Sequence, residues 1–371
     1  MSTTPDDGAL ERAEQRTLLM PRRDQGAELP RGHALQEFVV EQVLGMGGYS
    51  VVYLAQDTKL QRKVAVKEYL PGTLAARGPG GDVAPRLPRF AESYDKGLQS
   101  FINEARLLGS FDNPSLVKVY RFWAANGTAY MAMPYYNGIN LKKWLSDLGA
   151  PPSEKWLRAL AEPLMQALAV LHGANTLHRD VAPDNVLMLY DRAKGNYLEQ
   201  APRPVLLDFG AARRVAAEAT QNLTAILKSG YSPVEQYAND GGDKHADGNA
   251  MLQGPWTDVY ALCAVLYAAA TGKAPPPAIA RVVRDDMVPA RTAGKGRYSQ
   301  AFLAAIDAGL AVRPERRPQS MAELQDWFKR PDPPAAATQP AADLELPLAA
   351  PAPKAEEPGW LQRLIQRLFG R

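Results

Sequence analysis

Two short stretches of the chain carry side chains whose types and spacing suit metal binding and proton transfer. The first, HRDVAPDN, contains Asp180 and Asn185, and the second, DFG, begins with Asp208, 23 residues after Asn185. Carboxylate and amide oxygens are hard ligands that suit Mg²⁺, which makes Asn185 and Asp208 candidate metal ligands. A carboxylate such as that of Asp180 can also accept the proton of a reacting hydroxyl. The two stretches therefore predict a metal site and a general base.

An upstream stretch, GMGGYSVV at residues 45–52, suits phosphate binding. Glycines allow backbone N–H groups to approach phosphate oxygens with no Cβ in the way. The stretch lies between two predicted strands, whereas a Rossmann dinucleotide site lies between a strand and a helix, so the pattern argues against such a site. A plain glycine-rich hairpin turn is the alternative explanation for this stretch taken alone.

Lys67 ends the apolar stretch VAVK on the strand that follows this loop. A Lys on such a strand is costly to bury unless it is paired. Glu104, in FINEARLL on the next predicted helix, is the expected partner. Two unrelated charges that face solvent are the alternative. However, VAVK, HRD and DFG occur together and in this order, which argues against coincidence.

These motifs resemble those of the bacterial eukaryotic-like (Hanks-type) serine/threonine protein kinases, and the resemblance extends over about residues 35–329. Later landmarks also match. YSPVE at residues 231–235 resembles the segment that ends in A-P-E, and Asp258 in WTDVYAL resembles the buried Asp that holds the catalytic loop. Arg317 resembles the arginine that pairs with the Glu of that segment, which is Glu235 here.

The resemblance implies a role for each candidate residue. Asp180 would be the catalytic base, and Asn185 and Asp208 would bind Mg²⁺. Lys67, paired with Glu104, would be the cation that holds ATP. The implied ATP-binding positions are Gly45, Met46, Gly47, Gly48, Tyr49, Ser50, Val52, Ala65, Lys67, Met133, Tyr136, Leu187 and Asp208.

Ala182 is the departure from the family pattern that removes a group from the reaction. The family usually has a Lys at this position that reaches the phosphoryl group, whereas Ala can neither donate a hydrogen bond nor carry charge. Three residues before Tyr231, where the family usually has Thr, this chain has Lys228. Lys acts as a flexible point charge, so we expect Lys228 to restore the missing cation from the other side of the site. An exposed lysine without that role is the alternative, and Ser50 in place of the third glycine is a lesser departure.

The predicted function is Mg-dependent transfer of the γ-phosphoryl group of ATP to Ser/Thr hydroxyls of proteins, including the chain itself. A nucleotide-binding pseudokinase scaffold is the alternative, but a scaffold does not need the full set of catalytic groups that this chain retains. A small-molecule kinase is disfavoured by Glu235 and Arg317, because such enzymes generally lack this pair. Tyrosine specificity is disfavoured because no Arg lies between Asp180 and Asn185.

The segment between Gly210 and Tyr231 is a candidate site of regulation. Kinases with an Arg before the catalytic Asp, here Arg179, are commonly switched by phosphorylation of this segment, because a phosphate can pair with Arg. Arg213 and Arg214 are further candidate receivers of the phosphate. The candidate acceptors are Thr220, Thr224 and Ser229.

The elements that must position these residues are short strands followed by long helices. FVVEQVLG, SVVYLAQD and KVAVKEYL are rich in β-branched residues, which predicts antiparallel hairpins, whereas Glu154–His172 and WTDVYALCAVLYAAATG read as helices. We therefore expect an α+β, bilobal protein-kinase-like fold. It would have a small β-rich N-lobe with one main helix, a larger α-helical C-lobe, and the site in the cleft between them. The predicted domains are a loose tail at 1–33, a kinase domain at 34–330 (N-lobe about 34–135, C-lobe about 136–330), a Pro/Ala-rich linker at 331–358 and a basic amphipathic helix at 359–371.

The bulk composition places the chain among cytoplasmic globular proteins, with ATP and a protein substrate as the expected partners. Its 43 basic and 40 acidic residues give a net charge of +3, too small to indicate nucleic acid as a partner. Cys263 is the only cysteine, which fits a reducing compartment, and no apolar run reaches the ~18 residues of a membrane span. The C-terminal helix carries Arg363 and Arg367 off its apolar face. It is predicted either to dock on a partner or an anionic membrane surface, or to fold back on its own kinase domain.

Overall fold

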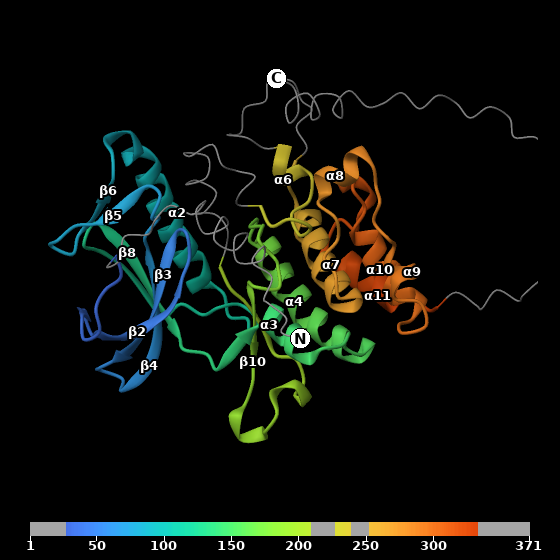
Figure 1. Ribbon diagram of the computed structural model, residues 1–371, viewed down its shortest axis with the longest axis horizontal. Helices are drawn as coiled ribbons and strands as arrows, with labels where there is room; N and C mark the ends of the chain where they lie inside the picture. Colours follow the sequence, from blue (N-terminus) through green and yellow to red (C-terminus); the bar gives the residue numbers. More distant parts are fainter. Residues whose placement is uncertain (1–26, 209–226, 239–251, 333–371) are drawn as a thin grey trace, which may run out of the picture. The chain divides into compact units, whose positions relative to one another are not determined.

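The computed structural model describes residues 27–208, 227–238 and 252–332 of the 371-residue chain (Figure 1). These residues belong to two compact units. The first unit comprises residues 27–112 and 117–136, and the second comprises residues 113–116, 137–208, 227–238 and 252–332. Most of the predicted linker and all of the predicted C-terminal helix lie outside the described residues.

A six-stranded antiparallel sheet forms the body of the first unit, and its strand order is β1-β2-β3-β4-β8-β7. The strands are rich in β-branched and aromatic residues, which pack well on a pleated surface. One long helix, α2, contacts strands β7 and β8. The bounds are β1 Ala34–Leu35, β2 Phe38–Met46, β3 Ser50–Asp57, β4 Arg62–Tyr69, α2 Ala91–Ser110, β7 Arg121–Ala125 and β8 Thr128–Pro134.

Helix α2 covers the face of the sheet that carries Lys67 and Tyr69. Glu104 of the helix forms an ion pair with Lys67, and the ring of Phe101 lies 5.8 Å from that of Tyr69. Neighbouring residues of a strand point to opposite faces, so Glu68 lies on the other face. The two faces of the sheet therefore carry opposite charges at this point: Lys67 on one and Glu68 on the other.

The segment between β4 and α2, which we call the insertion, forms a hairpin of β5 (Ala75–Arg77) and β6 (Val83–Pro85), followed by a short helix, η1 (Pro88–Phe90). Its residue Arg77 contacts the second face of the sheet at Glu68. Arg77 Nη2 donates to Glu68 Oε2 at 2.6 Å, and the hydroxyl of Tyr53 donates to the same oxygen at 2.8 Å. The side chain of Arg77 is 7% exposed and that of Glu68 is fully buried. The insertion thus supplies the cation that a buried acid of the sheet requires.

The same network holds the start of the described chain. The sequence predicts a loose tail through residue 33, but in the structure Leu29 is buried and its N–H donates to the Tyr53 hydroxyl at 3.1 Å. Arg77 also donates to the carbonyl oxygen of Ala27 at 2.8 Å. Residues 27–33 are ordered because their backbone meets donors and acceptors of the sheet and the insertion, which the polar composition of the tail does not reveal.

We expect Arg77→Ala to lower the free energy of unfolding by about 3–5 kcal/mol, because it leaves the buried Glu68 carboxylate without its cation. Urea unfolding, followed by circular dichroism, measures the change. Arg121→Ala is the matched control: Arg121 pairs with Glu37 at the surface, where an ion pair contributes about 0–1 kcal/mol. A loss for Arg77→Ala no larger than that of the control would contradict this account of the buried pair.

Helices dominate the second unit. Helix α7 is apolar almost all round and buried along most of its length, because it contacts α4, α9, α10 and α11. Ser153, Ser299 and Ser320 directly precede α4, α10 and α11 as N-caps, and the side chain of each accepts a backbone N–H from the first turn. A small antiparallel sheet of order β11-β10-β9 accompanies the helices. The bounds are β9 Gly138–Asn140, α3 Leu141–Leu148, α4 Glu154–Gly173, β10 Val186–Leu189, η2 Arg192–Lys194, η3 Tyr197–Glu199, β11 Pro204–Leu206, α6 Glu235–Ala238, α7 Pro255–Thr271, α8 Ala278–Val283, α9 Ala290–Ala293, α10 Gln300–Gly309, η5 Pro314–Arg316 and α11 Met321–Lys329.

The predicted α+β fold is confirmed: a β-rich unit with one long helix is joined to a helix-rich unit. Helices α4 and α7 lie where the sequence predicts them. Helix α2 begins at Ala91, well before the periodic stretch at 101–108, because Tyr94 and Gly97 are also buried. Among the described helices, none combines the length and the apolar character that a bilayer span requires.

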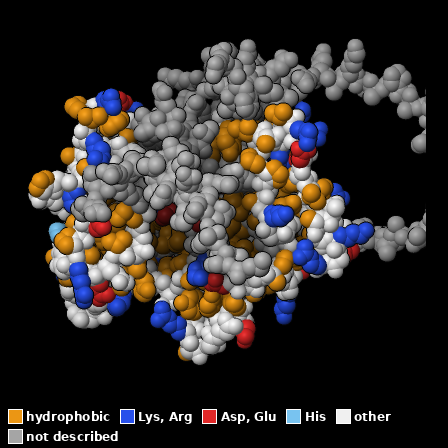
Figure 2. Space-filling model, viewed as in Figure 1, with side chains coloured by type: hydrophobic (Ala, Val, Ile, Leu, Met, Phe, Trp, Pro, Cys, Tyr) orange, Lys and Arg blue, Asp and Glu red, His pale blue; other side chains and the backbone are white. Residues whose placement is uncertain are grey.

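The charged side chains on the face drawn in Figure 2 are scattered: blue Lys and Arg side chains lie among hydrophobic and uncharged ones and do not gather over one element. Proteins that bind nucleic acid concentrate such charges in a patch or stripe. The distribution on this face agrees with the small net charge of +3.

Candidate active site

The turn between β2 and β3 is an exposed, glycine-rich loop. The N–H of Gly47 donates to the carbonyl oxygen of Ser50 at 2.8 Å and closes the turn. A Cβ added to Gly45 or Gly48 would meet no atom of the described residues within 4 Å, so packing against that part of the chain does not require glycine there. Glycine at these positions instead leaves the backbone open to a close ligand such as a phosphate.

The register of β3, β4 and β8 places four of the predicted nucleotide-binding side chains on one face of the sheet. Val52 pairs with Lys67, and Ala65 pairs with Met133. Directly opposite residues of an antiparallel pair share a face, and so do residues two apart on one strand. Val52, Ala65, Lys67 and Met133 therefore lie together, and Tyr136 follows at the end of the first unit.

Lys67 and Glu104 form a buried ion pair on this face. Lys67 Nζ lies 3.4 Å from Glu104 Oε1, and the two side chains are 8% and 2% exposed. Removing one partner of such a pair leaves an uncompensated buried charge, so each side chain depends on the other. Glu104 thus fixes the position of the Lys67 ammonium, which can bind phosphate oxygens.

In the second unit, Asp180 and Asn185 are bonded to each other. Asn185 Nδ2 donates to the backbone oxygen of Asp180 at 2.8 Å and to Asp180 Oδ2 at 2.6 Å. These bonds engage the amide nitrogen and leave the amide oxygen as the atom that can ligate a cation. Asp180 is itself buried, so its carboxylate is a potential base with a fixed orientation.

Asp258, on α7, holds the backbone of this loop. Its carboxylate accepts the N–H of His178 at 2.9 Å and that of Arg179 at 2.8 Å, and His172 Nε2 lies 2.8 Å from it. Burial alone would raise the pKa of Asp258, but the hydrogen bond and electrostatic interaction with His172 and the N–H of Arg179 outweigh burial and hold the pKa below its usual value. The sequence predicts Asp258 in this role but carries no signal for His172, which is 86 residues away.

His178 links the loop to the residue before Asp208. Its Nε2 lies 3.1 Å from the carbonyl oxygen of Leu207, and its Nδ1 accepts the N–H of Asp180 at 3.3 Å. This pattern requires a neutral ring protonated on Nε2, in agreement with burial, which lowers the pKa of His178. The N–H of Leu207 donates to the carbonyl oxygen of Asn185 at 2.9 Å, so the backbone of Leu207, the residue before Asp208, is anchored on two sides.

Arg179 and Asp208 have left-handed backbone conformations, with φ values of 64° and 47°. A residue other than glycine rarely adopts this conformation, and it costs about 1–3 kcal/mol. Hydrogen bonds hold Arg179 in it: Asp258 accepts its N–H, and Gln236 Nε2 donates to its carbonyl oxygen at 2.8 Å. The exposed side chain of Asp208 extends from a similarly unusual backbone and is a candidate metal ligand.

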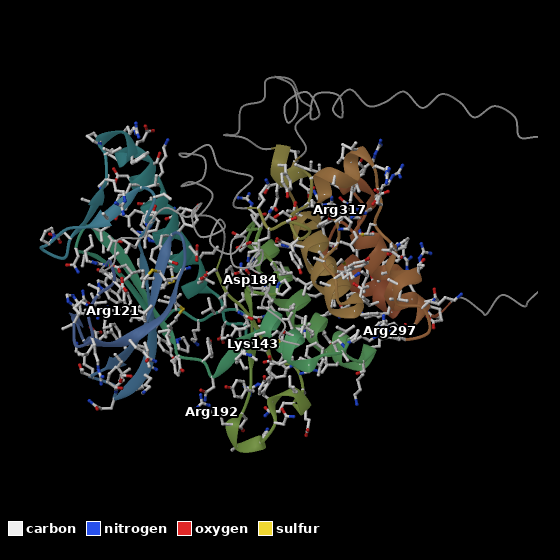
Figure 3. All side chains as sticks on the ribbon, in the orientation of Figure 1. Arg121, Lys143, Asp184, Arg192, Arg297 and Arg317 are labelled. Carbon is white, nitrogen blue, oxygen red and sulfur yellow. The ribbon has the colours of Figure 1, made fainter. Side chains whose placement is uncertain are left out.

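Lys228 lies beside Asp180. Its Nζ is 3.4 Å from Asp180 Oδ1 and 2.7 Å from Asp184 Oδ1. Asp184, labelled in Figure 3, is not among the predicted site residues although it belongs to HRDVAPDN. Ala182 is fully buried and presents no polar side-chain group. The proximity that the sequence predicts for Lys228 is present, and its role stays a prediction.

Glu235 and Arg317 form a fully buried ion pair (Arg317 is labelled in Figure 3). Two guanidinium nitrogens of Arg317 donate to the two carboxylate oxygens of Glu235 at 2.7 and 3.2 Å. Thr257, on α7, donates to Glu235 Oε1 at 2.9 Å. The pair therefore ties the end of YSPVE to the helical core, as the sequence predicts from the resemblance.

The described residues provide too few side-chain ligands to bind a metal ion by themselves. Within residues 27–208, 227–238 and 252–332, no three or more His, Cys, Asp or Glu side chains form a self-contained metal site. A metal at Asn185 and Asp208 would thus need further oxygens, and phosphates and water supply these in typical Mg²⁺ sites. Leu187 lies on β10. Six other predicted positions lie outside the described residues: Phe209, Gly210, Arg213, Arg214, Thr220 and Thr224.

We expect the stabilising contribution of Asp258 to disappear in acid. Because its pKa is lower in the folded protein than in the unfolded chain, the contribution is present in full above about pH 4 and is lost as the pH falls through the folded pKa. Asp258→Asn should therefore have a lower free energy of unfolding than the wild type at neutral pH, and the difference should shrink as the pH falls below about 4. Urea unfolding at a series of pH values measures this.

The control for that series is Asp326→Asn, which removes a carboxylate whose side chain is 75% exposed. Its free energy of unfolding should follow that of the wild type at every pH. A gap between Asp258→Asn and the wild type that stays constant into acid would show that the charge of Asp258 is not what holds the loop.

Comparison with known proteins identifies the family of this chain. The model of the protein kinase domain matches residues 38–328, which include every described segment of the site. The chain belongs to the protein kinase family.

Two named relatives are bacterial. Serine/threonine-protein kinase PknB of Mycobacterium leprae (strain TN) is 30% identical to this kinase-family chain over 305 residues, which is 79% of the chain and 42% of PknB. Serine/threonine-protein kinase PrkC of Bacillus subtilis (strain 168) is 27% identical over 239 residues, 64% of the chain and 31% of PrkC. The chain spans less than half the length of these curated relatives.

Solved structures agree on the fold. The structure "PpkA-294 apo form" is 37% identical in sequence and superposes with a TM-score of 0.71, over 82% of this chain and 100% of that one. The Mycobacterium tuberculosis PknI kinase domain is 21% identical, with a TM-score of 0.56, over 81% of this chain and 99% of that one. At 21% identity the second likeness supports the fold alone.

Proposed function

We propose that the chain is a protein serine/threonine kinase that transfers the γ-phosphoryl group of ATP to Ser or Thr hydroxyls of proteins. The observation that carries the proposal is the arrangement at Asp180, a buried carboxylate that is oriented by Asn185 and has the Lys228 ammonium 3.4 Å away. A base that removes the proton of an alcohol requires such a fixed carboxylate. Family membership supplies the reaction class, and PknB and PrkC are named as serine/threonine kinases.

In the proposed reaction, Asp180 accepts the proton of the acceptor hydroxyl. The hydroxyl oxygen forms a bond to the γ-phosphorus, the bond from that phosphorus to the β,γ-bridging oxygen breaks, and ADP leaves. Lys67, oriented by Glu104, binds phosphate oxygens, and the loop at 45–50 donates backbone N–H groups to them. Adenine would contact the apolar side chains that share the face of Lys67, among them Met133.

Mg²⁺ is the metal that these residues fit. The amide oxygen of Asn185 and the carboxylate of Asp208 are hard ligands, and the ligands still missing would be oxygens of the nucleotide and water. When bound, the metal neutralises charge on the phosphates. The chain contributes ligand orientation: Asn185 is fixed by Asp180, and the backbone at Asp208 is fixed through Leu207.

A protein acceptor is supported by the Glu235–Arg317 pair. The pair anchors residues 231–235, which in the resemblance shape the groove for a peptide, and small-molecule kinases generally lack it. We place the enzyme in the cytoplasm. Support for that location comes from Cys263, which is free and buried, as suits a reducing compartment.

Radiolabelled ATP tests the proposal, with the chain itself and a basic protein as acceptors. We expect the wild type to incorporate label and Asp180→Asn to lower kcat by about 10²–10⁴-fold, because the variant has no general base. Nucleotide affinity should stay near that of the wild type, since Asp180 is not a proposed ligand of ATP. A wild type that binds Mg·ATP but labels no acceptor would overturn the proposal in favour of the pseudokinase scaffold.

Mass spectrometry tests the proposed autophosphorylation. We expect phosphate on at least one of Thr220, Thr224 and Ser229 when the wild type is produced, and none when Asp208→Asn is produced, because the variant lacks a metal ligand. Ser229 is exposed in the structure and thus accessible to a second enzyme molecule. Equal phosphorylation of both proteins would assign these sites to another kinase of the expression host.

A further inference from the structure

We infer that Lys228 is a catalytic residue, a cation that stabilises the phosphoryl group during its transfer beside Asp180. The inference rests on the proposed kinase activity and adds to it the source of positive charge next to the base. Its grounds are the contacts of Lys228, the rigidity of the turn that carries it, and the charge of the loop that it faces.

The ammonium of Lys228 lies between two carboxylates of the catalytic loop. Asp184 Oδ1 accepts a hydrogen bond from Nζ at 2.7 Å, and Asp180 Oδ1 lies 3.4 Å away. The side chain of Lys228 is only 17% exposed. An ammonium has three N–H donors, so at least one remains for a phosphoryl oxygen when the two carboxylates each take one. Because Asp180 is the proposed base, this donor lies next to the place where the acceptor hydroxyl must bind.

The turn at residues 228–232 fixes the position of Lys228. The carbonyl oxygen of Lys228 accepts the N–H groups of Tyr231 and Ser232, both at 2.9 Å, and its own N–H donates to Ser232 Oγ at 3.1 Å. Gly230 has a φ of +83°, and a Cβ there would lie 2.5 Å from the carbonyl oxygen of Pro275. Glycine is thus required at this point. The backbone that carries the Lys228 side chain is therefore fixed by the hydrogen bonds of this turn.

The stretch from Asp180 to Asn185 contains no cation. It carries the carboxylates of Asp180 and Asp184, with Val, Ala and Pro between them. Charge on the phosphoryl oxygens must nevertheless be stabilised while they are close to Asp180. A preorganised donor in such a place contributes about 10²–10³-fold in rate. Lys228 supplies it from a segment more than forty residues further along the chain.

A purely structural clamp is the competing explanation. In that case the Lys228–Asp184 pair only joins the turn to the loop, and loss of the ammonium would loosen both. The two explanations differ in what the ammonium recognises. A catalytic cation binds the transition state more tightly than the ground state, whereas a clamp affects both states equally.

The experiment compares the full-length wild type with Lys228→Met, which removes the charge but keeps an unbranched side chain. Steady-state kinetics give kcat and KM for ATP. Calorimetry gives the dissociation constants of Mg·ADP alone and of Mg·ADP with aluminium fluoride, which mimics the phosphoryl group in transfer. We expect Lys228→Met to lower kcat by about 10²–10³-fold and to weaken the aluminium fluoride complex by a similar factor, with Mg·ADP affinity changed less than about twofold.

Two further variants serve as controls. Lys143→Met removes the same charge from α3, where Lys143 is exposed and paired with Asp147, and it should leave all four quantities unchanged. Lys228→Arg keeps the positive charge with a different shape, so it should retain at least about tenfold more activity than Lys228→Met.

The outcomes separate the inference from the proposed function. If Lys228→Met weakens both nucleotide complexes equally, or turns over like the wild type, Lys228 is not catalytic and the proposed kinase activity stands. If Lys228→Arg is no more active than Lys228→Met, the charge is not what matters, and the inference also fails. A wild type without turnover that also fails to discriminate the two complexes overturns the proposed function, and the inference with it.

Discussion

The buried carboxylate of Asp258 is the constraint on which the site of the second unit depends. It accepts two consecutive backbone N–H groups, those of His178 and Arg179, and its hydrogen bonds with His172 and Arg179 hold its pKa below the usual value despite burial. Asp258 belongs to α7, which is buried almost all round and cannot shift without disrupting its neighbours. The loop thereby acquires the rigidity of the core. This rigidity allows Arg179 to keep a left-handed backbone conformation, and the direction of the Asp180 carboxylate follows from it.

Paired charges connect the functional groups with the fold in both units. Lys67 with Glu104, Glu68 with Arg77, and Glu235 with Arg317 are buried pairs whose members come from distant parts of the sequence. A buried pair adds little to stability compared with apolar packing, but removing one partner is severe. Each pair therefore acts as a condition on the fold, because only an arrangement that brings both members together avoids an isolated buried charge. Lys67, which is proposed to bind ATP, is therefore positioned by a buried ion pair of the same kind as the purely structural pair Glu68–Arg77.

Local patterns in the sequence are sufficient for β2, β3 and β4, for α4 and α7, and for the motifs that indicate a kinase. Those features depend on neighbours along the chain: alternation in a strand, apolar periodicity in a helix, and fixed spacing within a loop. His172 could not be predicted in the same way, because its importance comes from lying 2.8 Å from Asp258, which only the packing of α4 against α7 produces. The burial of Leu29 cannot be predicted from local patterns for a related reason. Its surroundings are polar, and the groups that order it, Tyr53 and Arg77, come from other segments. The roles of the site residues themselves stay predictions.

The position of Lys228 changes how the two parts of the proposed chemistry depend on each other. A cation carried within the catalytic loop would be fixed by the same bonds that fix Asp180, so base and cation would be ordered together. Here the base is fixed by Asp258 and Asn185, whereas the cation is fixed by the turn at 228–232. Under the inference about Lys228, ordering the loop is necessary but not sufficient, because the turn must also be formed. Catalytic competence would then respond to anything that orders or disorders the segment next to Ser229, even where the loop is unaffected. The replacement of a loop lysine by Ala182 would thus preserve the charge while moving control of it to a different part of the chain.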